Sequence, residues 1–546
     1  MSSFTGDLTI TLVLTITGTA HTIPAGNVKS LELSLTPYGF NGKVSFVVSC
    51  EESTDALFTP MSTLNDLIEV SLQVKAYSND SDAVITPLIL SGLATTRGFS
   101  EQTLGNILKS QAFMLHRHYH LEFADPAQVL WKQHFPCELL TDTTLKALIT
   151  AHKSAKIDLL FDWAAVLDKS YPVLTLSLGA PGSQASFYDY LIWLVDTNNG
   201  VFSYNFATKK YSLSTAKIQT GTVQSFSFLE VSSFSVEFPE VIRYQPKVLN
   251  AYSESPLNTA IANVPMATPI RRDYIQRYPI AADMTARVTL ETARLKQHLH
   301  EVWVDYSSFQ MEVTPPGKLV DFKGSSAWNA SLFVHANTYQ VREWRLVAHS
   351  VHQELTLNLN NTYSRYTMEH SLKLDLKAEL NVALPPYVLP IYPFFVEGKV
   401  LSEQGEDTDV TYQFYTDKDT SINYYQINIP LWADKKVRAA YQSNMDTGQF
   451  YFPPYKKARV LVGLGFDNAV ITQFLDWGSG TALPLDSQGN QLVMGKSTTS
   501  QNIIKHTYVD SKPDLQIQRT DAKDTELLQF SDGYIILRTQ LEEGEG

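Results

Sequence analysis

The chain has 546 residues, of which 44% are hydrophobic and 18% are charged. This composition excludes a disordered protein, and the length predicts several domains, because single hydrophobic cores stop growing near about 250–300 residues. The net charge of -13 argues against a general nucleic-acid-binding protein, which needs clustered lysine and arginine to contact phosphates. The two cysteines are too few for a disulfide framework, so we expect them to be reduced and the chain to fold in a cytoplasm.

The first block, residues 1–98, alternates polar and apolar residues at a period of two, which predicts strands in a β-barrel or a sandwich. The basic residues that precede the apolar core of a signal peptide are missing, so no signal peptide is expected. No run of about 18 apolar residues occurs, so no membrane-spanning helix is expected either. The predicted strands are 8–16, 29–40, 42–50 and 67–77.

The second block, residues 99–240, is predicted to contain two capped helices. Thr143 or Thr144 can cap the first, Ser186 can cap the second, and an Asn-Asn-Gly sequence ending at Gly200 terminates the second. Apolar residues in the second helix recur at helical spacing, which is typical of a helix packed on a core. The two helices are predicted over 144–152 and 187–196, and a hairpin is expected directly after them.

A third helix is predicted over 285–303, with Thr285 as its cap. His298, His300 and Glu301 then lie at its end, and the spacing of the two histidines points their rings apart. The H-E-x-x-H spacing of a zinc protease is missing. We therefore expect a solvated helix terminus at this place.

The fourth block, residues 385–478, carries five short predicted strands, which suggest a small closed barrel of the OB type. The last block, residues 479–546, adds four short β-like segments without a helix to cover them. Such strands cannot bury themselves alone, so we expect them to pair with copies of themselves. The barrel strands are predicted over 394–402, 409–417, 424–432, 457–466 and 469–477, and the tail segments over 502–511, 513–520, 525–532 and 533–540.

Six segments between residues 105 and 540 follow one another in a recognisable order. They are 107–123, 186–214, 313–324, 339–353, 450–477 (FYFPPYKKARVLVGLGFDNAVITQFLDW) and 525–539 (TELLQFSDGYIILRT). Their pattern and order resemble those of VgrG-type spike proteins and phage tail hub proteins. In that family the last segment is the entrance to an intertwined trimeric β-helix.

The resemblance implies a mainly β fold with a few helices, built from two barrel-like hub domains, an OB-fold barrel and a short C-terminal trimeric β-helix. In the family, the hub domains trimerise into a ring of approximate sixfold symmetry, from which the barrels and the β-helix project. For this chain it implies an N-terminal β-barrel hub domain (1–98), a helix-containing hub domain (99–240), a second hub barrel (241–384), an OB-fold domain (385–478) and a neck with a short spike (479–546).

The resemblance also implies a structural hub and spike of a contractile injection machine, in which a trimer connects the tube to the membrane-piercing tip and helps load effectors. The implied partners are further copies in a homotrimer, an Hcp-like tube protein, baseplate proteins, a PAAR-like tip protein, effector cargo and the target membrane, without nucleic acid. The machine is a type VI secretion system, a phage tail or an extracellular injection system. We expect assembly in a bacterial cytoplasm or in the particle, followed by export or injection into a target cell.

Four apolar residues of the tail, Leu527, Phe530, Ile535 and Ile536, are predicted to face the trimer axis or its walls. For each of them, a place in an ordinary strand core is the alternative. The blunt EEGEG ending (542–546) suggests that the tail stops before a sharp point would form, so we expect a separate tip protein.

Two motifs contain residue types that bind zinc or phosphate, but we predict a binding site at neither. His116, His118 and His120 would share one strand face and could present three imidazoles to zinc, but we favour a polar strand face and predict no metal site. Gly489 and Gly495 have five residues between them, whereas a P-loop has four, so we predict a β-turn there. The lysine and serine of that motif are Lys496 and Ser497.

No G-x-S-x-G motif occurs, and neither Cys50 nor Cys137 has a catalytic signature. We therefore predict that the protein is not an enzyme and needs no cofactor. Acidic loop residues could bind calcium or cleave glycosides, but solvated hairpin loops are the simpler interpretation. These residues are Glu403, Glu406, Asp407, Asp409, Asp417 and Asp419.

Two other functions remain as alternatives. A carbohydrate-binding or cell-surface-binding β-barrel protein without a transport role would use the many tyrosine and tryptophan side chains to stack on sugars. The missing signal peptide and the missing carboxylate pair argue against it. An OB-fold nucleic-acid-binding protein is disfavoured by the acidic balance and the few arginines.

Overall fold

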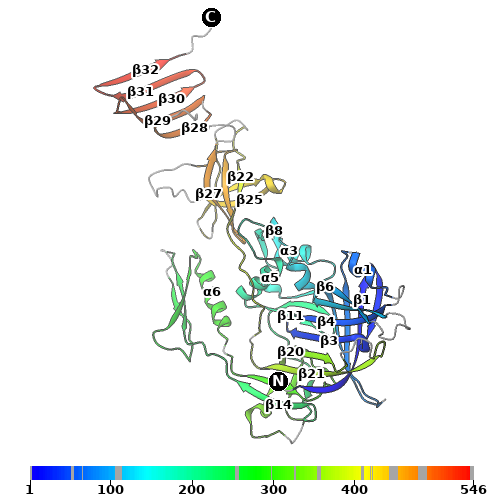
Figure 1. Ribbon diagram of the computed structural model, residues 1–546. Helices are drawn as coiled ribbons and strands as arrows, with labels where there is room; N and C mark the ends of the chain where they lie inside the picture. The colour runs from blue at the N-terminus through cyan, green and yellow to red at the C-terminus, as the bar shows by residue number, and fades with distance from the viewer. Residues whose placement is uncertain are drawn as a thin grey trace. The chain divides into compact units, whose positions relative to one another are not determined.

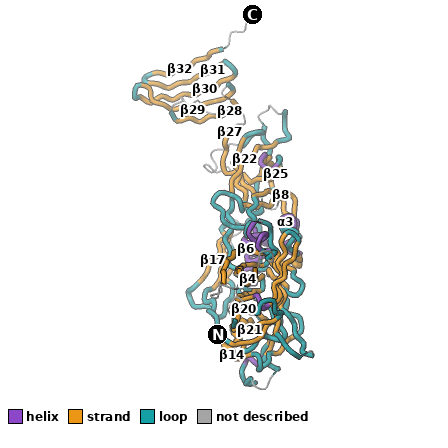
Figure 2. The backbone as a smooth tube through the Cα atoms, turned by 45° about the vertical axis from the view of Figure 1, so that its right-hand side comes forward, coloured by secondary structure: helices purple, strands orange, loops and turns teal. Residues whose placement is uncertain are grey.

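Figure 1 shows the computed structural model, whose chain divides into two compact units. Strands predominate and helices are few, as Figure 2 shows, which confirms the predicted mainly β fold class. Unit 1 comprises residues 1–135, 149–169 and 184–390, and unit 2 comprises 136–148, 170–183 and 391–546. The structure describes residues 3–50, 55–63, 65–80, 82–104, 114–252, 257–296, 298–324, 328–352, 358–380, 382–406, 411–418, 420, 422–441, 453–476, 489–497 and 499–541.

Eight strands of unit 1 form a closed ring. Their pairing runs β20-β3-β4-β7-β6-β5-β1-β21, and antiparallel pairing of β20 with β21 closes it. Burial alternates along β1, where Leu8, Ile10 and Leu12 are buried and the residues between them are partly exposed, so one face of the strand fills a core. The eight strands are β1 (Phe4–Ile16), β3 (Val28–Thr36), β4 (Gly39–Cys50), β5 (Glu69–Ala76), β6 (Leu88–Leu104), β7 (Met114–Ala124), β20 (Thr338–Ser350) and β21 (Tyr363–Leu376).

This ring joins distant parts of the sequence. β1 pairs with β21 and β3 pairs with β20, so strands from the predicted blocks 1–98 and 241–384 share one sheet. Further strands extend the sheet outward from β21, β20 and β1. The block boundaries themselves stay a prediction. The added strands are β2 (Thr19–Pro24), β13 (Val223–Ser225), β14 (Val231–Glu237), β18 (Glu301–Tyr306) and β19 (Leu319–Asp321).

Helix α5 begins where the sequence predicts. The Ser186 hydroxyl accepts from the Asp189 N–H at 3.3 Å, and the Asp189 carboxylate accepts from the Ser186 N–H at 2.8 Å, which together form a capping box. Gly200 follows the helix, and a side chain there would lie 2.4 Å from the Trp163 ring. The predicted hairpin follows as β11 and β12, which β9 joins. These elements are α5 (Phe187–Thr197), β9 (Leu159–Asp162), β11 (Val201–Asn205) and β12 (Lys210–Ser214).

Helix α3 (Leu145–His152) also begins as predicted. The Thr144 hydroxyl accepts from the Ala147 N–H at 3.1 Å, so Thr144 is the cap of the two candidates.

Helix α6 differs from the prediction at both ends. It begins at Ala281, so Thr285 lies one turn inside it and donates its hydroxyl to the Ala281 carbonyl at 3.1 Å instead of capping. The predicted extension to residue 303 is also wrong, because residues 301–306 form strand β18, in which burial alternates at a period of two. The helix packs on a small sheet, and the elements are α6 (Ala281–Arg294), β15 (Gln245–Asn250), β16 (Asn258–Ala260) and β17 (Arg271–Gln276).

Unit 2 contains the predicted five-stranded barrel, closed by pairing of β22 with β24. Three of its strands lie where the sequence predicts them and a fourth, β24, overlaps its prediction, whereas β25 was not predicted, and only the short β23 forms within 409–417. Apolar residues at alternate positions, such as Val400, Ile427 and Val460, fill its core. The five barrel strands are β22 (Phe394–Leu401), β24 (Asn423–Ile429), β25 (Lys435–Tyr441), β26 (Arg459–Leu464) and β27 (Ala469–Asp476), and the short β23 (Tyr415–Thr416) pairs with β24 outside the closed barrel.

The tail forms a sheet of five antiparallel strands joined in sequence order. Four strands match the predicted segments. The first strand occupies the place where a β-turn was predicted, so that prediction is wrong: Gly495 lies inside a strand, and only Gly489, with φ +93°, has turn geometry. We call this sheet the tail sheet; it consists of β28 (Asn490–Ser497), β29 (Ser500–Val509), β30 (Lys512–Asp521), β31 (Asp524–Ser531) and β32 (Tyr534–Gln540).

The other elements are short. Among the described residues, no helix is long and apolar enough to cross a membrane. The remaining elements are η1 (Ala25–Asn27), α1 (Phe58–Thr63), α2 (Pro126–Trp131), α4 (Ala164–Leu167), α7 (Phe333–Ala336), β8 (Cys137–Thr144), β10 (Ser170–Ser177) and η2 (Pro430–Trp432).

Candidate functional site

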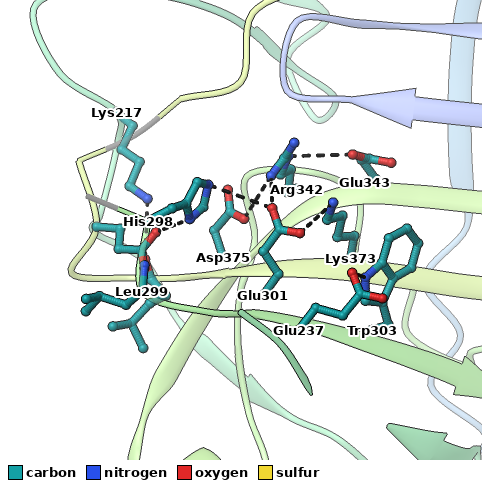
Figure 3. Close-up of polar contacts among 12 residues, drawn as sticks. Lys217, Glu237, His298, Leu299, Glu301, Trp303, Arg342, Glu343, Lys373 and Asp375 are labelled. Atoms are coloured by element: carbon teal, nitrogen blue, oxygen red, sulfur yellow. Dashed lines mark hydrogen bonds and ion pairs between the residues drawn. The ribbon is translucent and has the colours of Figure 1, made fainter. Parts of the chain in front are cut away.

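A cluster of charged side chains lies where the sequence predicts a solvated helix terminus, as Figure 3 shows. His298 precedes β18, and its Nδ1 lies 2.7 Å from a carboxylate oxygen of Glu379, which follows β21. Glu301, His300 and Glu379 are buried, so the prediction of a solvated terminus is wrong. The hydrogen bond to Glu379 raises the pKa of His298. Burial works to raise the pKa of Glu379, but hydrogen bonds from His298 and the Leu299 N–H hold it below its usual value.

Glu301 is the centre of this cluster. One of its oxygens lies 2.5 Å from Arg342 Nη1, and the other lies 2.7 Å from Lys373 Nζ. Arg342 stands at a bulge in β20, between the positions that pair in register, and it also reaches Asp375 at 3.5 Å. Burial would raise the pKa of Glu301, but Lys373 and Arg342 hold it below its usual value.

The charged cluster contains residue types that bind metal ions. Donor atoms of His298, Glu301 and Asp375 lie within 4.8 Å of one another. However, Arg342 bridges the two carboxylates and Lys373 pairs with Glu301, so a cation would have to displace side chains that already neutralise them. The cluster thus contains three carboxylates and three basic side chains, which is the composition of a structural ion network and not of a metal site. They are Glu301, Asp375 and Glu379, and His298, Arg342 and Lys373.

The three histidines predicted to share a face do lie on alternate positions of β7. His116 is buried, His118 is half-buried, and the exposed His120 packs its ring over Gly98 of the paired strand. Burial, with the nearby charges of His120 and Lys29, lowers the pKa of His118. Their ring nitrogens are not among the donor groups that converge in the described residues.

The cysteines and the acidic loop residues singled out in the sequence do not join the charged cluster in the described part of the chain. Cys137 lies in β8 as a free, exposed thiol, and the Cys50 side chain lies outside the described residues. Asp417 accepts from the N–H and the hydroxyl of Thr420, as a loop carboxylate does. Glu403 and Glu406 are exposed, whereas Asp407, Asp409 and Asp419 lie outside the described residues.

The tail sheet has two chemically different faces. Pairing in register places Ile517 beside Leu528, and Leu528 beside Leu537, so these side chains project from the same face. Three of this face's residues show how open it is: Phe530 is 40% exposed, Ile535 65% and Leu537 82%. We call this the apolar tail face, after the apolar residues that make up most of it: Leu492, Met494, Ile504, Leu515, Ile517, Leu528, Phe530, Ile535 and Leu537. Register also places polar residues along one side and at one corner of this face, namely Asn490, Asn502, His506, Arg519, Glu526 and Thr539.

The opposite face of the tail sheet is mostly polar. It carries glutamines, threonines and the carboxylate of Asp514, which accepts from the amides of Gln516 and Gln529. Register also places Leu527 and Ile536 on this face, opposite Arg538 and Gln529. The structure therefore separates the four predicted tail residues, with Phe530 and Ile535 on the apolar tail face and Leu527 and Ile536 on the other. Strand alternation could have shown this had the register of the hairpins been known.

No family model and no curated protein sequence matches this chain. Its fold does match solved structures. A chain of the Francisella PdpA–VgrG complex in its lidded form aligns with a TM-score of 0.70 and 13% identity, over 98% of this chain and 80% of that one. A chain of the half-lidded Francisella complex aligns with a TM-score of 0.68 and 14% identity, over 98% of this chain and 88% of that one. A chain of a lidless PdpA–VgrG complex aligns with a TM-score of 0.68 and 13% identity, over 98% of this chain and 99% of that one. The chain therefore has the fold of a chain in the PdpA–VgrG complex, which supports the predicted VgrG-type fold.

Proposed function

We propose that this protein is a structural hub and spike of a contractile injection machine, and not an enzyme. The fold supports this role, because the likeness to chains of the PdpA–VgrG complex extends over 98% of this chain. The chemistry supports it as well: the buried carboxylates of the charged cluster are held in ion pairs between strands, an arrangement that stabilises a sheet.

The observation that carries the proposal is the apolar tail face. A sheet that exposes Phe530, Ile535 and Leu537 on one face leaves a large hydrophobic gain unused, about 25 cal/mol for each Å² of apolar surface. Within the described residues, β28 and β32 are the edge strands of this sheet, and no further strand pairs with the outer side of either. Two further copies of the chain would cover these faces and edges, so the folded tail and a homotrimer would form together.

In this role the hub domains would contact an Hcp-like tube protein and baseplate proteins. The tail would carry a PAAR-like tip protein and effector cargo towards a target membrane. The trimer would assemble in the bacterial cytoplasm, or in a phage or injection particle, and would be exported or injected when the machine fires.

Two neighbouring leucines test the trimer. Leu528 lies on the apolar tail face and Leu527 on the polar face of the same strand, and both are half-buried. We expect the wild-type chain to have the mass of a trimer by light scattering. Leu528→Glu should dissociate it, because burying a carboxylate in an apolar interface costs several kcal/mol, roughly enough to lose the assembly at micromolar concentration. Leu527→Glu, the matched control, should leave the trimer intact.

A monomeric wild-type protein would overturn the trimer. Equal dissociation by the two variants would show that the apolar tail face is not the contact surface. Circular dichroism of both variants checks that the strands still form.

A further inference from the structure

The outer face of the barrel in unit 2 carries a set of cations in register. Arg459 of β26 pairs with Lys399 of β22, Lys399 with Asn428 of β24, and Asn428 with Lys436 of β25. Paired side chains project from the same face, and neighbouring strands lie about 4.8 Å apart. Arg438 stands two residues from Lys436 on the same face. The four basic side chains Lys399, Lys436, Arg438 and Arg459 thus lie on one small surface.

Three of these four charges lack a paired acid among the described residues. Arg459 is paired with Glu397 at 2.6 Å. Among the described residues, Lys399, Lys436 and Arg438 belong to no ion pair, and all three are exposed. Like charges on adjacent positions repel one another. In a protein of net charge -13, this surface is complementary to an anionic partner.

Polar and aromatic side chains complete the surface. Gln426 lies between Leu401 and Arg438, and its amide can both donate and accept hydrogen bonds. Tyr424 follows on β24 and stacks with Tyr415, with ring centroids 5.5 Å apart and planes 19° apart. We call this surface the outer barrel face; it consists of Glu397, Lys399, Leu401, Tyr415, Tyr424, Gln426, Asn428, Lys436, Arg438 and Arg459, so that one carboxylate stands beside four basic side chains.

We propose that the outer barrel face binds an anionic polysaccharide that carries carboxylates. The lysines and Arg438 would pair with the acid groups, the Gln426 amide would bind hydroxyls, and the Tyr424 ring would hold the Arg438 guanidinium in place. A nucleic acid fits less well, because stacked bases need free ring faces. Here Tyr415 covers one face of Tyr424, and the Arg438 guanidinium lies 5.4 Å from its centroid. This binding is independent of the trimer and of the proposed hub and spike function.

The test measures binding of the full-length protein to polygalacturonate by calorimetry, with neutral dextran and a single-stranded DNA oligonucleotide of equal charge as competing probes. We expect polygalacturonate to bind, more weakly as salt is added, and dextran not to bind. Replacing Lys399, Lys436 and Arg438 together by Gln should weaken binding about tenfold or more, and Tyr424→Leu about threefold at unchanged charge.

The matched control is a triple variant, Lys75→Gln, Lys318→Gln and Lys323→Gln, which removes the same charge from unit 1. It should change the affinity by less than about twofold. No binding by the wild-type protein, equal weakening by the two triple variants, or tighter binding of the oligonucleotide would each overturn the proposal. Thermal unfolding of every variant shows that the barrel is intact.

Discussion

At the scale of single residues, buried carboxylates in unit 1 are held by donors from distant strands. The fully buried Asp125 accepts from the Phe40 N–H at 3.1 Å, from the Gln128 N–H at 3.2 Å and from the Tyr211 hydroxyl at 2.5 Å. Glu301 is held in the same way by Arg342 and Lys373. Leaving a buried charge without partners costs roughly several kcal/mol. Asp125 and Glu301 therefore favour the arrangement of strands that brings their donors together.

The contact between His298 and Glu379 predicts a pH dependence of stability. The raised pKa of His298 gives a stabilisation that is complete below its unfolded pKa and is lost as the pH rises through the folded pKa. The lowered pKa of Glu379 gives a stabilisation that is lost as the pH falls through the folded pKa of Glu379. The contact between His298 and Glu379 therefore stabilises the folded protein most at pH values between the folded pKa of Glu379 and that of His298. His298→Gln should lower the free energy of unfolding by about 1 kcal/mol near pH 6, after allowance for solvent screening, and by less near pH 9.

Urea unfolding at the two pH values measures this difference. The control places His298→Gln in a Glu379→Gln background, where the pH dependence of its effect should shrink. An effect of His298→Gln that is the same at both pH values would show that the histidine is not charged in the folded protein.

At the scale of elements, the sequence locates most strands of the barrel and tail by their alternation of polar and apolar residues. It misses β25 because Ala439 and Ala440 are too small and too alike to show which side is buried. It takes the start of the tail sheet for a turn because two glycines stand there, although only Gly489 has a positive φ. It extends α6 too far because the residues after Arg294 are good helix formers, whereas β18 gains from pairing with β21.

Helix capping gives a prediction at this scale. Ser186 accepts a hydrogen bond from the first turn of α5, whereas the Thr285 hydroxyl lies inside α6 and bonds backwards to Ala281. Ser186→Ala should therefore cost about 1 kcal/mol of stability, and Thr285→Ala less than about 0.5 kcal/mol. Urea unfolding of the two variants measures both values. Equal losses would mean that the capping box contributes nothing beyond ordinary surface effects.

At the scale of the whole molecule, the tail sheet and the barrel differ in how they are stabilised. In the part of the chain that the structure describes, the buried residues of the barrel core come from unit 2 residues up to Ile471, and none comes from the tail sheet. A chain cut after residue 478 should therefore keep the thermal transition of the barrel but lose the trimer mass in light scattering. A truncated chain that remains trimeric would place the main trimer contacts in the hub instead of on the apolar tail face.

The sequence by itself determined the mainly β class, the barrel segment, the Ser186 cap and the order of segments that resembles the VgrG and phage hub family. These features depend on local patterns, namely alternation, capping residues and turn residues, which a single segment carries. Only the tertiary structure decided that β1 pairs with β21, that Arg342 reaches Glu301 and Asp375, and which tail residues share a face. Those features depend on register between strands far apart in the chain. A shift of one residue reverses every side chain, so register is fixed by the packed sheet and not by any one strand.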